Sequence, residues 1–95
     1  MTDLLLIDDD EELCELLITW LAQEGFSARA CHDGASARAA LAERQPAAVV
    51  LDVMLPDGSG LELLKQLRSE HPDLPVLMLS GRGEPLDRIL SLIHI

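Results

Sequence analysis

Residues 48–60 read AVVLDVMLPDGSG, and this stretch decides the fold. Val49, Val50 and Leu51 form a short apolar run rich in β-branched side chains, which is typical of a buried strand. Asp52 ends the run, and a loop rich in proline and glycine follows it. The C-terminal ends of strands are where open α/β sheets bind ligands. Asp52 is therefore the leading candidate for the functional residue.

Two more apolar runs, 4–7 and 76–79, also end in polar side chains. If the three strands are parallel neighbours, their C-terminal ends lie together. These ends contribute Asp8, Asp9, Asp52 and Ser80. Crowded carboxylates repel one another, so the cluster predicts a bound cation. Oxygen ligands without histidine or cysteine favour Mg²⁺, Mn²⁺ or Ca²⁺ over zinc.

The segments between the strands have the spacing of amphipathic helices. Segment 11–24 is predicted to bury one stripe, made of Leu13, Leu16, Leu17, Trp20 and Leu21. Asp10 is a suitable N-cap for it, and Gly25 a suitable residue after its end. Segment 35–44 is alanine-rich, and its predicted inner face carries Ala35, Ala39 and Leu41.

Two further helices are expected. The third is marked by Leu61, Leu64 and Leu67, with Ser59 and Glu62 spaced as a capping box. The fourth begins near Pro85, and its apolar pattern consists of Leu86, Ile89, Leu90 and Ile93. Strands are expected at about 3–7, 26–30, 47–51 and 76–79. This alternation predicts an α/β fold, a flavodoxin-like doubly wound parallel sheet with strand order 2-1-3-4.

Three pieces of the sequence have a familiar order and spacing. They are LLLIDDD at 4–10, VVLDVMLPDGSG at 49–60 and PVLMLSGR at 75–82. Together they resemble the receiver domains of two-component response regulators, across nearly the whole chain to about Leu90.

The resemblance implies a phosphoacceptor module rather than a turnover enzyme. Asp52 would accept a phosphoryl group from a sensor histidine kinase. Asp8, Asp9 and Asp52 would hold Mg²⁺ or Mn²⁺, and the backbone carbonyl of Met54 would complete the protein ligands. The Ser80 hydroxyl would hydrogen-bond a phosphoryl oxygen. A DNA-binding output domain outside this chain and a cytoplasmic location are also implied.

Two features depart from the family. Its members continue into a fifth strand, which carries a lysine that pairs with the phosphoryl group, and then into a fifth helix. This sequence ends at Ile95, residues 91–95 are atypical, and its only lysine is Lys65. We therefore expect one receiver domain, 1–95, incomplete at its C-terminus. Strand 76–79 would then form an exposed sheet edge, so the isolated chain is expected to self-associate.

Two other functions stay open. One is a receiver-like interaction fragment that takes no phosphate, which the missing lysine favours. The other is a Mg²⁺-dependent phosphatase with an aspartyl nucleophile, as in enzymes of the haloacid dehalogenase type. Those enzymes use Asp-x-Asp, with the second Asp as acid and base, but here that position is Met54, which cannot transfer protons. Asp10 and Asp57 are interpreted as a helix cap and a turn residue rather than as ligands.

The composition and the spacing of particular residues argue against several classes of function. A formal net charge of −10 argues against binding of this segment to nucleic acid or to an anionic membrane surface. No apolar run approaches the ~20 residues needed to cross a bilayer. Cys14 and Cys31 lack metal-binding spacing and are interpreted as core thiols. The histidines share no spacing and are interpreted as surface residues: His32, His71 and His94.

Overall fold

The computed structural model describes residues 2–55, 57–79 and 93–94. Within these residues one sheet has the order β2-β1-β3-β4-β5. Its strands are β1 (Thr2–Ile7), β2 (Phe26–Cys31), β3 (Ala48–Asp52), β4 (Val76–Leu79) and β5 (Ile93–His94). The first four are parallel, so the predicted flavodoxin-like sheet with order 2-1-3-4 is confirmed.

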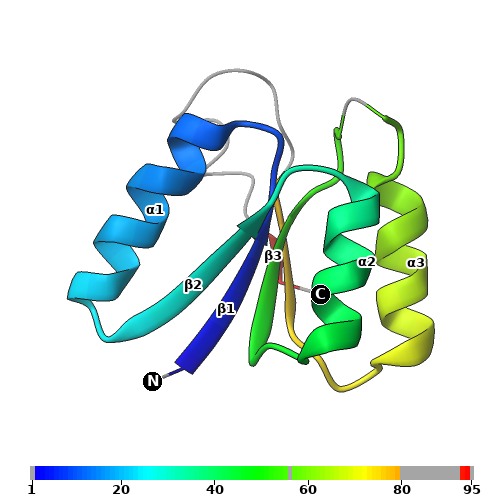
Figure 1. The fold of residues 1–95 in the computed structure, drawn as a ribbon. Coiled ribbons are helices and arrows are strands. Elements are labelled where there is room, and N and C mark those ends of the chain that lie inside the picture. Colours follow the sequence, from blue (N-terminus) through cyan, green and yellow to red (C-terminus); the bar gives the residue numbers. More distant parts are fainter. Residues whose placement is uncertain (1, 56, 80–92, 95) are drawn as a thin grey trace.

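Helices cover both faces of this sheet (Figure 1). Helix α1 (Glu11–Gln23) lies on one face, and α2 (Gly34–Glu43) and α3 (Gly60–Glu70) lie side by side on the other. The main core cluster joins strand residues to the inner faces of α2 and α3: Leu5, Ile7, Val49, Leu51, Ala37, Leu63 and Leu67. This arrangement leaves the C-terminal ends of β1 and β3 next to each other at one edge.

The ends of α1 and α2 are formed by local hydrogen bonds. Asp10 is the N-cap of α1, as predicted, and its Oδ1 accepts a hydrogen bond from the Leu13 amide at 3.0 Å. Asp33 caps α2 in the same way through the Ser36 amide at 2.8 Å. Gly25 follows the end of α1 with a φ of 90°, a conformation that glycine adopts at little cost. These caps set where each helix begins relative to the strand before it.

The predicted inner faces of the helices need correction. On α1, Leu16 and Trp20 are 64% and 57% exposed, whereas Cys14 is fully buried. On α2 the buried residues are Gly34 and Ala37, while the predicted Ala35 and Ala39 are exposed.

On α3 the error has a clear physical cause. The helix begins at Gly60, where a Cβ atom would collide with the backbone of Val53, so this position must face the loop after β3. Positions three and seven residues later then face inward, and Leu63 and Leu67 are buried. Of the three leucines that marked the predicted helix, Leu67 is buried and Leu64 packs against the core, but Leu61 is 58% exposed. Ser59 occupies the N-cap position but makes no side-chain cap bond, so the predicted capping box is wrong.

The expectation that β4 forms the exposed edge is also wrong. β5 pairs antiparallel with β4, through Leu77 with His94 and Met78 with Ile93. Ile93, predicted in the fourth helix, therefore lies in a strand. The backbone N–H and C=O groups at the edge of a sheet readily pair with another segment, and a β-branched residue such as Ile93 favours the extended conformation. The rest of that predicted helix lies outside the described residues. Among the helices described, none is both long and apolar enough to span a membrane.

Candidate metal and phosphoacceptor site

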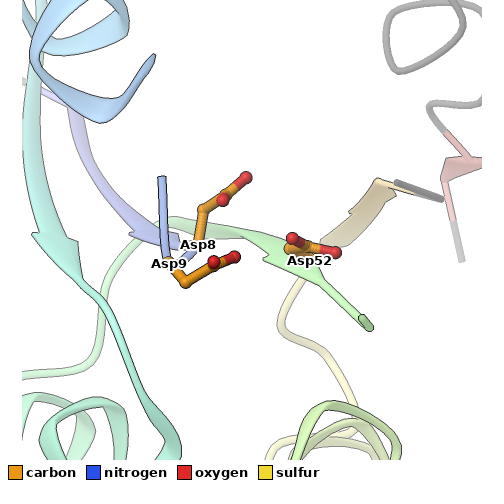
Figure 2. Close-up of side chains that lie close together, drawn as sticks. All are labelled: Asp8, Asp9 and Asp52. Atoms are coloured by element: carbon orange, nitrogen blue, oxygen red, sulfur yellow. The ribbon is translucent and has the colours of Figure 1, made fainter. Parts of the chain in front are cut away.

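Three carboxylates meet at the C-terminal edge of the sheet (Figure 2). Asp8 and Asp9 follow β1, and Asp52 is the last residue of β3. One carboxylate oxygen from each residue lies within 4.8 Å of the other two. Asp8 and Asp52 are each only 3% exposed, whereas Asp9 is exposed to solvent. The structure therefore brings together the three aspartates that the sequence placed at neighbouring strand ends.

Local backbone geometry orients the two buried carboxylates. The Asp10 amide donates to Oδ1 of Asp8 at 2.9 Å, and the Met54 amide donates to Oδ1 of Asp52 at 2.9 Å. Both are turns in which an aspartate accepts a bond from the amide two residues later. Each turn fixes one oxygen of its carboxylate and brings the following backbone close to it. Met54 thus lies beside Asp52 with a largely exposed side chain, which leaves its main chain as the part that could act at the site.

The donor set fits a hard divalent cation. All three side chains offer oxygen, and Mg²⁺ and Ca²⁺ take oxygen ligands at about 2.1 and 2.4 Å. Two oxygens on opposite sides of such an ion are thus about 4.2 to 4.8 Å apart, and the three carboxylate oxygens lie within 4.8 Å of one another. Asp8, Asp9, Asp52 and the Met54 carbonyl could hold the ion.

Asp57 has a different role from the three clustered aspartates. Its Oδ1 accepts bonds from both the amide and the hydroxyl of Ser59, and its Oδ2 accepts one from the Gly34 amide at 3.3 Å. The Ser59 hydroxyl, the Ser59 amide and the Gly34 amide together lower the pKa of Asp57 below its ordinary value. Asp57 is thus a turn residue, as predicted, and it also ties the loop after β3 to the start of α2.

Ser80, the remaining predicted site residue, is outside the described residues. Lys65 is exposed on α3, and its Nζ lies 3.8 Å from Glu62 on the same helix. Cys14 and Cys31 are buried free thiols, as predicted. Burial raises the pKa of the Cys31 thiol, which opposes the thiolate form needed for metal binding.

One contact at this edge was missed from the sequence. His32, interpreted as a surface residue, is half-buried, and its Nδ1 lies 2.9 Å from the main-chain oxygen of Asp8. In the sequence, the one feature that could have predicted this contact is that His32 directly follows the second strand, just as Asp8 directly follows the first. Its use depends on knowing which strands are neighbours.

Comparison with known proteins shows the family to which the chain belongs. Residues 4–93 match the response regulator receiver domain family. The chain is 48% identical over 88 residues to a Mycobacterium tuberculosis protein named as the probable transcriptional regulatory protein TcrX, with 93% of this chain and 38% of that protein covered. The chain thus spans about two fifths of the length of the curated relatives it matches.

Solved structures share the fold. The non-phosphorylated receiver domain of HemR from Leptospira biflexa is 30% identical with a TM-score of 0.79, over 96% of this chain and 73% of that one. A Burkholderia pseudomallei response regulator, solved with a phosphorylated aspartic acid, a calcium ion and citrate, is 25% identical with a TM-score of 0.79 over 96% of this chain and 54% of that one. In sequence and fold, this chain belongs to the receiver domain family of two-component response regulators.

Proposed function

We propose that the chain accepts a phosphoryl group on Asp52 from a sensor histidine kinase, with Mg²⁺ or Mn²⁺ bound beside it. The observation that carries this proposal is the placement of a buried, oriented carboxylate at a strand end, with two further carboxylates within 4.8 Å. A carboxylate in such a place can act as a nucleophile on phosphorus. The phosphorylated aspartic acid and calcium ion of the Burkholderia protein support the same chemistry.

The reaction is a simple displacement. An oxygen of Asp52 attacks the phosphorus of a phosphohistidine, the phosphorus–nitrogen bond breaks, and the imidazole leaves with its electron pair and takes up a proton. Such transfers depend mainly on positioning and on charge neutralisation. The cation supplies that neutralisation when bound, held by Asp8, Asp9, Asp52 and the Met54 carbonyl. The Met54 amide, which bonds Oδ1 of Asp52, holds the nucleophile in one orientation.

Ser80 completes the proposed site. It follows Leu79, which pairs with Asp52 across β3 and β4. Its hydroxyl would donate a hydrogen bond to a phosphoryl oxygen once Asp52 is modified.

The proposed output is regulation of transcription. The relatives named as transcriptional regulatory proteins are longer than this chain, so the DNA-binding part would lie outside it. The formal net charge of −10 opposes contact with DNA by this segment itself. The two free cysteines fit the cytoplasmic location that belongs to the same proposal.

Phosphate incorporation from acetyl phosphate tests the proposal. The wild-type chain with MgCl₂ should gain one phosphoryl group by intact-mass measurement, and EDTA should prevent the gain. Asp52→Asn should gain none. Asp57→Asn is the matched control, because it removes a charge from the following loop, and it should still be modified.

The alternatives give other outcomes. An unmodified wild-type chain that remains folded would indicate an interaction domain that takes no phosphate. Release of inorganic phosphate over many turnovers would indicate a phosphatase. Modification retained in Asp52→Asn would show that a different residue is the nucleophile.

A further inference from the structure

The imidazole of His32 makes a hydrogen bond to the backbone that joins two of the clustered aspartates. His32 directly follows β2, and its Nδ1 lies 2.9 Å from the carbonyl oxygen of Asp8. A carbonyl oxygen can only accept, so Nδ1 must carry the proton and donate it. His32 is half-buried, so the bond is partly shielded from water.

The ladder between β1 and β2 explains why a side chain reaches this oxygen. Ile7 pairs with Cys31, and the Asp8 amide donates to the Cys31 carbonyl at 3.0 Å. In a continuing parallel ladder, the amide of residue 33 would donate to the Asp8 carbonyl. Asp33 instead leaves the strand direction and caps α2. The His32 imidazole takes the position on the Asp8 carbonyl that the ladder would have filled.

The carbonyl group of Asp8 lies between two of the clustered aspartates along the chain. It belongs to the peptide group that links Asp8 to Asp9, and that group is planar. Holding the Asp8 oxygen therefore restrains both the ψ angle of Asp8 and the φ angle of Asp9. Cys14 of α1 adds a second, weaker contact, with its Sγ at 3.7 Å from the same oxygen.

We propose that His32 is a positioning residue for the cation site, acting through the Asp8–Asp9 peptide. This inference rests on the proposed function, since it requires that Asp8 and Asp9 bind the ion. In this role His32 contacts neither the ion nor the phosphoryl group. Residues that orient metal ligands in this indirect way commonly change metal affinity by about ten- to a hundredfold when they are removed.

The test uses all 95 residues of the sequence and MgCl₂ alone. Asparagine places its Nδ2 where the histidine Nδ1 stands, whereas glutamine places its donor at the Nε2 position. The Mg²⁺ dissociation constant is measured from the NMR shift of the Asp10 amide, which bonds the Asp8 carboxylate. We expect His32→Ala and His32→Gln to weaken Mg²⁺ binding by about tenfold, and His32→Asn to restore it to within about threefold of wild type.

His71→Ala is the matched control. The His71 Nδ1 also makes one hydrogen bond, at 3.1 Å to Gln45, but it follows α3 and has no contact with the site. Its Mg²⁺ affinity should equal that of wild type. If His32→Ala is unfolded, the comparison of the asparagine and glutamine variants decides the question.

The possible outcomes distinguish the role of His32 from the proposed function of the cation site. Equal Mg²⁺ affinity in wild type and His32→Ala would overturn the role of His32 and leave the proposed function standing. Lower stability of His32→Ala in urea without a change in affinity would also overturn it, since His32 would then only join β1 to β2. A wild-type chain that shows no Mg²⁺-dependent shift would overturn both.

Discussion

Asp52 is a buried carboxylate that faces two like charges in the absence of a cation. Asparagine has nearly the same shape and keeps the Oδ1 that accepts the Met54 amide. Asp52→Asn should therefore preserve the local turn and remove one source of repulsion. We expect the metal-free variant to be more stable by at least about 1 kcal/mol, because two repulsive pairs are lost and each is worth about 1 kcal/mol even in a water-like medium.

Urea unfolding in EDTA measures this effect. Asp73→Asn, in the exposed loop before β4, is the control and should change the free energy of unfolding by less than about 0.5 kcal/mol. A metal-free Asp52→Asn variant less stable than wild type would mean that the carboxylate is stabilised by its surroundings rather than strained by its neighbours.

Asp57, unlike Asp52, has neighbours that stabilise its charged form. Hydrogen bonds from the Ser59 hydroxyl, the Ser59 amide and the Gly34 amide lower its pKa in the folded chain. Its ordinary value is 3.8. The stability that it contributes is therefore fully present above that value, and is lost as the pH falls through the lower pKa of the folded state. Asp57→Asn should be less stable than wild type at neutral pH, and the difference should shrink in acid below the ordinary pKa.

Urea midpoints of both chains, measured from neutral pH to about pH 2, give this difference directly. In a Ser59→Ala background the pH-dependent part should be smaller, because one of the donors is absent. A difference that grows on acidification would contradict the assignment.

At the scale of elements, α3 offers two leucines on one helix with opposite environments. Leu63 is fully buried in the core cluster that also contains residues of β3 and α2, whereas Leu61, two residues earlier, is exposed. Leu63→Ala should lower the free energy of unfolding by about 3 kcal/mol, because it leaves a cavity in the core. Leu61→Ala should change it by less than about 0.5 kcal/mol. Equal losses in a thermal or urea melt would show that the helix is rotated differently about its axis.

At the scale of the whole molecule, Mg²⁺ binding should appear as stability. A ligand that binds only the folded state raises the free energy of unfolding, by about 2.7 kcal/mol at one hundred times its dissociation constant. MgCl₂ should therefore raise the melting temperature of the wild-type chain and EDTA should reverse this rise. NaCl at the same ionic strength controls for general screening of the net charge of −10.

Asp9→Asn separates the site from the rest of this acidic molecule. Asp9 is an exposed member of the aspartate cluster, so the substitution should cause little loss of metal-free stability. It should remove most of the stabilisation specific to MgCl₂. A melting temperature that responds equally to MgCl₂ in both chains would indicate that the ion acts elsewhere.

The sequence by itself determined the four parallel strands, the turns and the edge of the sheet that carries the site, because these depend on neighbours along the chain. Short apolar runs that end in aspartate need only a local pattern to be recognised, and the predicted cap at Asp10 is a local hydrogen bond. Their alternation with helical segments implies a parallel sheet. The meeting of Asp8, Asp9 and Asp52 then follows from strand direction and order alone.

Only the tertiary structure decided which side of each helix is buried and which strand lies at the edge of the sheet. Leu61 and Leu63 are chemically identical, and the close approach of Gly60 to the Val53 backbone selects between them. The pairing of β5 with β4 and the bond from His32 to Asp8 likewise join segments distant in sequence. Periodicity shows that a helix has an apolar face, but burial and long-range hydrogen bonds depend on the partner that packs there, and that partner is set by the fold as a whole.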